Sequence, residues 1–340
     1  GGPSLGLDML VLKYSAAGTL LWEYRFTGPD GLDDEAYKLI LDASSNVYVC
    51  GTSMGSVTQK DFAVFKLNSS GAPQWSKRYS HTNSEEYPVD IKITQSGDVY
   101  VTGYAFVSGN ASDFLTVKYN SSGTQQWVFP FNIGGEETGL SLALDASGNA
   151  YIGGYTNAYG TGNDCFVYSV SSAGSFRWMQ RYTGPGNADD KVNCIYIDQS
   201  GNIFAAGNTT QGASGNDVFA ACYNSNGTQL WLNTLNVGGN EIIYSVAGDL
   251  SSNIYLAGKT NAYGNSDDYL TISYNSSGSF RWMTSYNYSG TQNDAAIKVL
   301  PDNSGNVYVT GTSFDDYATI MYTPLTGLGQ PGSLIPDEYN

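Results

Sequence analysis

The sequence predicts an all-β protein, a β-propeller built from four-stranded antiparallel blades. The 340 residues include 41 glycines and 27 tyrosines, a composition that favours short strands joined by tight turns. Tryptophan recurs at gaps of 51 to 53 residues, at Trp22, Trp75, Trp127, Trp178, Trp231 and Trp282. A repeat of this length that carries several strand-like runs is typical of a propeller blade.

The four strands of one blade are clearest between residues 137 and 182. They are expected at 138–145, 149–155, 164–170 and 176–182. The turns at 145–148 and 171–174 place glycine beside Asp or Ser side chains, which is a hairpin signal. Trp178 and Tyr182 lie on one face of the last strand, so we expect this face to pack on the neighbouring blade.

Applied to the whole chain, this pattern gives two strands at the N-terminus, five complete blades and three strands at the C-terminus, which makes 25 strands. We predict six blades, with seven as the alternative, in a ring closed by strands from both termini, which removes the open edge. The strands at 8–14 and 316–322 compete for one place. One of them is therefore expected at an outer edge, or paired with a further domain or subunit. Residues 1–322 form a single propeller domain, and the Pro- and Gly-rich segment 323–340 is a tail or linker.

Three motifs resemble a known family: DYATIMY at 316–322, GNVYVTG at 305–311 and RYTGPGNADD at 181–190. They resemble the β-propeller repeat of secreted bacterial proteins called the SBBP family, and the resemblance covers nearly the whole chain. It implies an exported, often multidomain surface protein, frequently from Bacteroidetes-like bacteria. The resemblance brings no catalytic motif, and a count of six blades differs from the seven to which the family name refers.

Two columns of acidic residues accompany the repeat. Eight residues before the first hairpin turn, every repeat has a carboxylate: Asp34, Glu86, Glu137, Asp190, Glu241 and Asp294. An aspartate begins each third strand: Asp8, Asp61, Asp113, Asp164, Asp217, Asp268 and Asp316. If the first strand of each blade is innermost, both columns lie on the same face of the disc.

Two interpretations of the first column stay open. The carboxylates can accept backbone N–H bonds and link the loops, together with hydroxyl groups such as those of Thr209 and Thr260. Alternatively, they converge with carbonyl oxygens as a Ca²⁺ site, because Ca²⁺ prefers oxygen ligands. A feature that occurs in every blade favours the first interpretation.

The loops between the second and third strands point to a binding function. Most of them run nine residues, for example 52–60 and 208–216, and they differ while the strands repeat. Variable loops on a rigid frame are where recognition is usually placed. We predict a non-catalytic extracellular or cell-surface binding or scaffold module that holds a protein or glycan at this face. One alternative is a lectin in which Tyr159 and Tyr263 stack on sugar rings; another is a cation-stabilised structural or assembly module.

Other classes of protein are disfavoured. A net charge of −16 without a basic patch argues against nucleic-acid binding, and no apolar run reaches the roughly 18 residues of a transmembrane helix. The single histidine, His81, is expected at the surface and argues against an enzyme that relies on histidine. Adjacent acids such as Asp189 and Asp190 recur in several repeats, which favours an architectural role over glycoside chemistry. We expect no cofactor, Ca²⁺ excepted.

Overall fold

The computed structural model describes residues 6–81, 84–107, 111–211, 215–264, 266–288, 292–313, 316–323 and 337–338. The regular elements of these residues are β-strands, 26 in number, arranged in seven sheets. Within this part of the chain, no helix has the length and apolar character that a membrane span requires.

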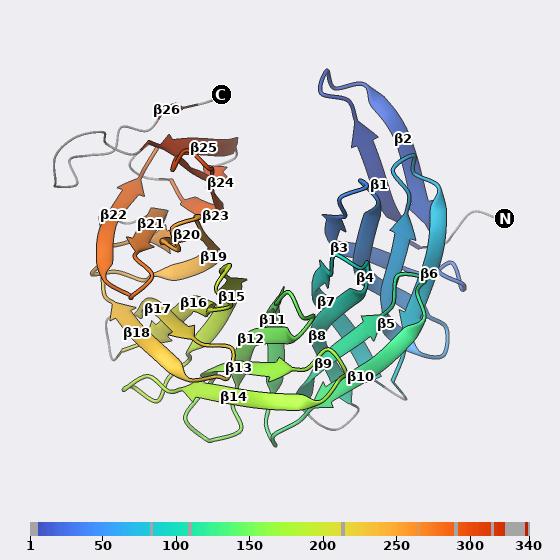
Figure 1. The fold of residues 1–340 in the computed structure, drawn as a ribbon, viewed down its shortest axis with the longest axis horizontal. Coiled ribbons are helices and arrows are strands. Elements are labelled where there is room, and N and C mark those ends of the chain that lie inside the picture. The colour runs from blue at the N-terminus through green and yellow to red at the C-terminus, as the bar shows by residue number, and fades with distance from the viewer. Residues whose placement is uncertain are drawn as a thin grey trace. The chain divides into compact units, whose positions relative to one another are not determined.

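The chain divides into two compact units, residues 1–152 with 170–176 and residues 153–169 with 177–340. The first unit contains a two-stranded sheet, β1 (Met9–Tyr14) and β2 (Leu20–Phe26), and two four-stranded sheets (Figure 1). These are β3 (Asp34–Leu41), β4 (Val47–Gly55), β5 (Gln59–Leu67) and β6 (Pro73–Tyr79), and then β7 (Ser84–Ile93), β8 (Val99–Val107), β9 (Ser112–Tyr119) and β10 (Gln125–Phe131).

The following sheet contributes strands to both units, and three more sheets belong to the second unit. The shared sheet comprises β11 (Glu137–Leu144), β12 (Ala150–Thr156), β13 (Asp164–Val170) and β14 (Phe176–Tyr182). The second unit then has β15 (Lys191–Ile197), β16 (Ile203–Thr210), β17 (Asn216–Tyr223) and β18 (Gln229–Leu235); β19 (Ile242–Gly248), β20 (Ile254–Thr260), β21 (Asp268–Tyr274) and β22 (Phe280–Tyr286); and β23 (Asp294–Pro301), β24 (Val307–Ser313), β25 (Asp316–Tyr322) and β26 (Asp337–Glu338).

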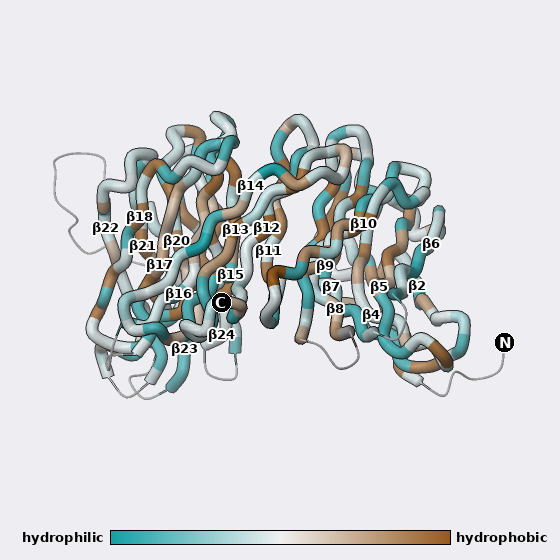
Figure 2. Tube along the Cα trace, turned by 90° about the horizontal axis from the view of Figure 1, so that it is seen from below, coloured by the Kyte–Doolittle hydropathy of each residue, from teal (hydrophilic) through white to brown (hydrophobic). Residues whose placement is uncertain are grey.

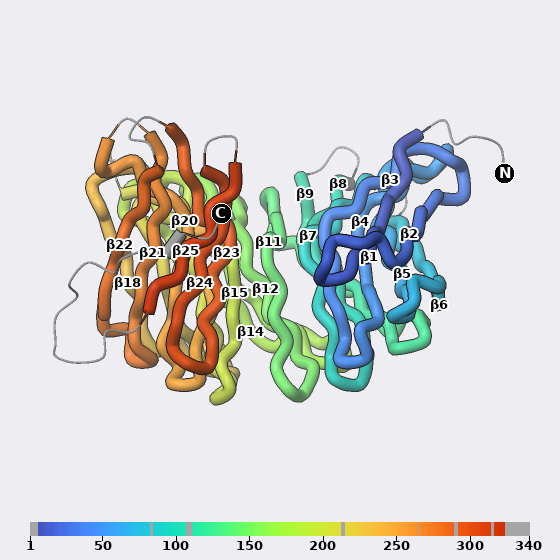
Figure 3. Tube along the Cα trace, turned by 90° about the horizontal axis from the view of Figure 1, so that it is seen from above, coloured from blue at the N-terminus to red at the C-terminus, as the bar shows by residue number. Residues whose placement is uncertain are grey.

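Each four-stranded sheet is a meander in which consecutive strands pair. Neighbouring strands with a defined register run antiparallel, as β16 and β17 do. The first strands of successive sheets lie beside one another, β3, β7 and β11 in the first unit and β15, β19 and β23 in the second. Within each unit, the hairpins after the first strands lie at one end of the strands, and the loops from second to third strands lie at the other (Figure 3).

Tryptophan fastens each sheet to the next one. Trp75 on β6 donates its indole N–H to the carbonyl oxygen of Ser121 at 3.1 Å, in the last hairpin of the following sheet. The ring lies on Gly123, whose φ is +79°, and a Cβ there would stand 2.7 Å from the indole. Trp22 with Gly71, Trp127 with Gly174, Trp178 with Gly227 and Trp231 with Gly278 repeat this contact. The predicted packing of the last strand on its neighbour is thus confirmed.

Buried tyrosine and phenylalanine side chains fill the space between the sheets, and Figure 2 shows hydrophobic and hydrophilic stretches alternating along the strands. The four cysteines, Cys50, Cys165, Cys194 and Cys222, are free and buried. His81 is exposed, as predicted.

The 25 strands predicted from the repeat are present. In the blade used as the example, the third and fourth strands agree with β13 and β14, and the first two are displaced by a single residue. The chain also has β26, within the predicted tail, which pairs with β25. The remainder of that tail from 324, and residues 212–214 and 314–315 of the variable loops, lie outside the described residues. Blade number, ring closure and the single-domain assignment stay predictions.

Candidate ligand-binding site

The six carboxylates of the first column lie within two residues of the start of the first strands and are almost completely buried. Their side chains belong to residues that are 0 to 2% exposed: Asp34, Glu86, Glu137, Asp190, Glu241 and Asp294. Each accepts a backbone N–H from the loop that leads into its strand. The N–H of Gly184 donates to Asp190 and that of Tyr288 to Asp294, the second at 3.0 Å. Glu241 also accepts the Thr260 hydroxyl at 2.7 Å.

These carboxylate residues also link one sheet to the preceding one. The N–H of Asp190 donates to the carbonyl oxygen of Asn163 at 2.7 Å, and the N–H of Asn163 donates to Asp189 at 3.1 Å. The same reciprocal pair joins Glu241 and Asn240 to Asn216. Asn163 and Asn216 immediately precede the aspartates of the second column, so the link crosses from the third strand of one sheet to the first strand of the next.

The second column completes these junctions in two ways. In three of them an arginine near the end of the last strand of its sheet forms an ion pair with the aspartate: Arg25 with Asp8, Arg78 with Asp61 and Arg181 with Asp164. We call these the Arg-closed junctions. In the Asn-closed junctions an asparagine follows the fourth strand, and its side-chain amide donates to the aspartate: Asn132 to Asp113 at 2.5 Å and Asn287 to Asp268 at 2.6 Å. Asn236 has the corresponding place in the sequence at the junction of Asp217 and Glu241.

Burial raises the pKa of several of these acids, Glu86 and Glu241 among them. It raises the pKa of Glu86 to about 7, and the neighbouring Asp61 carboxylate adds to the shift, while hydrogen bonds from Ser84 and His81 oppose it. Burial also raises the pKa of Glu241, with a further contribution from Asp217. A buried carboxyl group beside a second carboxylate holds its proton more tightly.

The Ca²⁺ interpretation finds no ligand cluster in the described part of the chain. There, no group of three or more His, Cys, Asp or Glu side chains is arranged to hold a metal ion. The first-column carboxylates already accept N–H and hydroxyl donors, so a cation would compete with these donors for the carboxylate oxygens. Ca²⁺ binding therefore stays a prediction.

Tyr159 and Tyr263 are 44% and 55% exposed. The guanidinium carbon of Arg181 lies 4.0 Å from the centre of the Tyr159 ring, so one face of this ring is already covered. Arg181 also pairs with Asp164 at 3.4 Å, which connects this loop to an Arg-closed junction. Sugar binding by these two tyrosines stays a prediction.

An aromatic cluster in the first unit departs from the repeat. It consists of Tyr87 on β7 and Tyr104 and Phe106 on β8, with Tyr37 on β3 close enough to interact electrostatically with Tyr87 and Tyr104. Tyr87 and Tyr104 are directly opposite in the β7–β8 pair, and their rings stack with centroids 5.3 Å apart. Phe106 meets them edge-on at 6.0 and 5.5 Å. Tyr37 is 44% and Phe106 43% exposed, so the cluster presents aromatic surface to solvent.

Charged groups surround the cluster. The Tyr37 hydroxyl donates to Glu35 and the Tyr87 hydroxyl to Glu85, each at 2.8 Å. The Lys60 ammonium lies 5.4 Å from the centre of the Tyr87 ring and 3.7 Å from Glu35. The cluster thus combines apolar ring surface with hydrogen-bonding groups at its margin.

The repeat pattern of the sequence did not predict this cluster, because the cluster occupies positions that vary from one repeat to the next. The place of Tyr87 holds Glu35, Thr138, Lys191, Ile242 and Ala295 in the other repeats. Among the positions that vary, this repeat has Tyr87, Tyr104 and Phe106 together. That coincidence is the signal that could have identified them, although the contribution of Tyr37 from another sheet required the structure.

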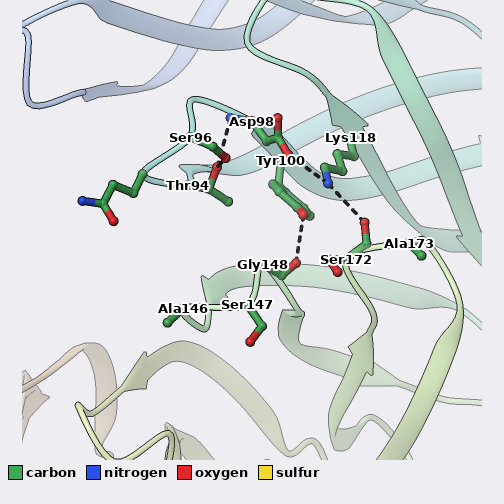
Figure 4. Close-up of a pocket in the computed structure, with 11 residues that line it drawn as sticks. Thr94, Ser96, Asp98, Tyr100, Lys118, Ala146, Ser147, Gly148, Ser172 and Ala173 are labelled. Carbon is green, nitrogen blue, oxygen red and sulfur yellow. Dashed lines mark hydrogen bonds and ion pairs between the residues drawn. The ribbon is translucent and has the colours of Figure 1, made fainter.

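A polar cleft of about 480 Å³ lies at the hairpin end of the first unit (Figure 4). Lys118 reaches across it, with its ammonium 3.0 Å from Asp98 and 3.1 Å from the carbonyl oxygen of Ser172. The Tyr100 hydroxyl donates to the carbonyl oxygen of Gly148 at 2.8 Å. These polar groups are engaged with one another, so the cleft is a weaker candidate than the aromatic cluster.

A change in the hairpin turn explains this geometry. Tyr151 and Tyr255 donate their hydroxyls to the aspartates of their own turns, Asp145 and Asp249, each at 2.9 Å. The turn below Tyr100 has Thr94 in the place of that aspartate. Because threonine offers no carboxylate, the Tyr100 hydroxyl donates to the next hairpin instead.

A scan against protein-family models gives no match for this chain, and a search of curated proteins gives none either. Solved structures do match. A polysaccharide lyase of family PL25, an ulvan lyase bound to -[GlcA(1-4)Rha3S]-, has a TM-score of 0.53 at 12% identity, over 84% of this chain and 78% of that chain.

Two further structures are similar to a comparable degree. A protein of unknown function from Dyadobacter fermentans DSM 18053 has a TM-score of 0.50 at 11% identity, over 84% of this chain and 90% of that chain. The WD40 domain of Neurospora crassa Pan2 has a TM-score of 0.50 at 10% identity, over 85% of this chain and 86% of that chain. WD40 domains are β-propellers, so at these identities the comparisons support the propeller type of fold and carry no function.

Proposed function

We propose that the chain is a non-catalytic binding or scaffold module that acts outside the cell or at its surface. The observation that carries the proposal is the aromatic cluster, which interrupts an otherwise repeated frame. Contacts that recur at every junction serve the frame. A group of partly exposed rings that occurs within one repeat and its neighbour is free to serve a ligand, because aromatic side chains dominate binding surfaces.

The absence of an enzymatic role is part of the same proposal. The first-column carboxylates accept hydrogen bonds from the frame and are 0 to 2% exposed, so a substrate would not reach them. The extracellular location and the assignment to the SBBP-type repeat rest on the resemblance of the sequence motifs. The acidic composition is consistent with this location, because a high net charge keeps a protein soluble. We propose no nucleic-acid partner and no cofactor for binding.

The test is a binding screen of the full chain against arrays of extracellular proteins and glycans. Phe106→Ala is compared with wild type, and Leu250→Ala, at another exposed apolar side chain (68%), is the matched control. We expect at least one ligand whose binding Phe106→Ala weakens and Leu250→Ala leaves unchanged. Ligands that bind both variants as they bind wild type would contradict the proposed site.

A further inference from the structure

We propose that the aromatic cluster of Tyr37, Tyr87, Tyr104 and Phe106 binds an uncharged saccharide chain. This inference rests on the proposed binding function and names the ligand class of the same site. It differs from the lectin hypothesis above, which placed sugars at Tyr159 and Tyr263.

The surface chemistry suits a sugar ring. A pyranose has an apolar face of C–H groups and a rim of hydroxyls. The partly exposed rings of Tyr37 and Phe106 offer apolar stacking surface. Glu35 and Glu85 stand at the margin and, as carboxylates, can accept several hydrogen bonds each. Each already receives one tyrosine hydroxyl, so its further lone pairs are available to the hydroxyls of a ligand.

The extent of the cluster favours a saccharide over a protein partner. A stable protein interface buries roughly 800 Å² on each partner and involves about 20 to 30 residues. The cluster comprises a few side chains from β3, β7 and β8. An area of this size matches one sugar ring or a few of them.

The charges at the margin favour an uncharged saccharide over an acidic one. Glu35 and Glu85 provide two carboxylates against the single ammonium of Lys60, which lies 3.7 Å from Glu35. The whole chain carries a net charge of −16. Uronate or sulfate groups would meet a surface of their own sign, so the charged ligand in the ulvan lyase structure is a poor guide to this site.

The probes are soluble cello-, xylo- and manno-oligosaccharides as uncharged ligands, and oligogalacturonate and dextran sulfate as acidic ones, measured by isothermal titration calorimetry. We expect at least one uncharged probe to bind and the acidic probes to bind more weakly. Phe106→Ala and Tyr37→Ala should each weaken binding about 10-fold. Glu85→Gln should weaken it less, since the amide retains one acceptor. Tyr317→Ala, at a tyrosine that is 86% exposed and lies outside both candidate sugar sites, is the matched control, and near-UV circular dichroism verifies that the variants fold.

The outcomes separate this inference from the proposed function. If only acidic probes bind, or if an uncharged probe binds Phe106→Ala as it binds wild type, the saccharide inference is wrong. If the probes do not bind, but the array screen finds a protein whose binding depends on Phe106, the saccharide inference fails and the proposed function stands. If no ligand depends on the cluster, both fail.

Discussion

The Arg-closed and Asn-closed junctions accommodate two neighbouring acidic side chains in different ways. Both place two acidic side chains, one from each column, between consecutive sheets. At Asp61 and Glu86 the guanidinium of Arg78 supplies a positive charge. At Asp268 and Asp294 the partner is the neutral amide of Asn287. The frame thus tolerates a change of net charge at a junction, because the backbone N–H bonds to the first-column carboxylate are present in both classes.

Two junctions of each class share a loop sequence. The Arg-closed junctions at residues 25–34 and 181–190 share Arg, an aromatic residue and Thr-Gly-Pro, whereas the Asn-closed junctions at 132–137 and 236–241 share Asn-x-Gly-Gly-x-Glu. The junctions that begin at Arg78 and Asn287 have neither sequence. The glycines have different tasks. A Cβ on Gly184 would lie 2.5 Å from the Thr209 hydroxyl oxygen, so the backbone here passes too close to Thr209 for any residue other than glycine. Gly134 and Gly238 have φ of +105° and +108°, which favours glycine for its backbone.

The largest effect should come from removing the cation of a buried Arg-closed junction. Arg78→Met leaves Asp61 and Glu86 without a compensating charge, and we expect a loss of about 3 kcal/mol in the free energy of unfolding. Urea denaturation at pH 7 measures it. The control is Arg25→Met, since the Arg25 side chain is 62% exposed against 22% for Arg78. There the loss should not exceed about 1 kcal/mol. Equal losses would show that burial of the pair is not what matters.

Stability should also fall as the pH rises through the pKa of Glu86. Its pKa is raised from 4.5 to about 7, so the folded chain binds this proton more tightly than the unfolded chain does. The stabilisation is complete below pH 4.5 and is lost as the pH approaches 7, by up to about 3 kcal/mol.

Urea denaturation across this range should show the decline, and Glu86→Gln should reduce it because the amide does not titrate. Glu241→Gln makes the same comparison at an Asn-closed junction, where the pKa of Glu241 is also raised. A stability that rises between pH 4.5 and 7 in the wild type would overturn this account.

Replacing the second-column aspartate by asparagine should change the free energy of unfolding in opposite directions in the two classes of junction. Asp61→Asn leaves Arg78 without its charged partner, with an expected loss of about 2 kcal/mol. Asp217→Asn removes a negative charge that raises the pKa of Glu241, so the repulsion between the two acids falls, with an expected gain of about 1 kcal/mol. Thermal and urea unfolding of the two variants at pH 7 gives the comparison. Destabilisation of similar size in both would show that hydrogen bonding, and not charge, governs the second column.

The smallest expected effect is that of Ca²⁺ on the melting temperature. Because the first-column carboxylates already accept backbone and hydroxyl donors, we expect the melting temperature to be the same in millimolar Ca²⁺ and in chelator. A melting temperature that rises with Ca²⁺ concentration would support a cation bound by the folded state. Loss of that rise in Asp217→Asn, with its retention in Asp61→Asn, would place the cation at the Asn-closed junctions.

Much of the frame could be predicted from local sequence. Strand periodicity, glycine in the hairpins and the recurring tryptophan are properties of short segments, and they predicted β13 and β14 to the residue. The aspartates of the hairpin turns act within their own turns, as Asp145 does when it accepts the N–H groups of Ser147 and Asn149. Patterns of this kind depend on neighbours in the chain, so a single repeat is enough to recognise them.

Contacts between sheets required the tertiary structure. The acidic columns could be read from the sequence, but their pairing across consecutive sheets depends on residues about 25 positions apart, such as Asp61 and Glu86. The aromatic cluster likewise joins Tyr37, in the sheet of β3 to β6, to Tyr87 and Tyr104, which are both in the sheet of β7 to β10.

By itself, then, the sequence determined the all-β class, the strands and their order, because these follow from the short-range alternation of side chains and from turn residues. The tertiary structure decided which acids are buried together, which are balanced by arginine, and where aromatic side chains from two sheets form a surface. Those outcomes depend on how neighbouring sheets pack, and no single repeat encodes that arrangement.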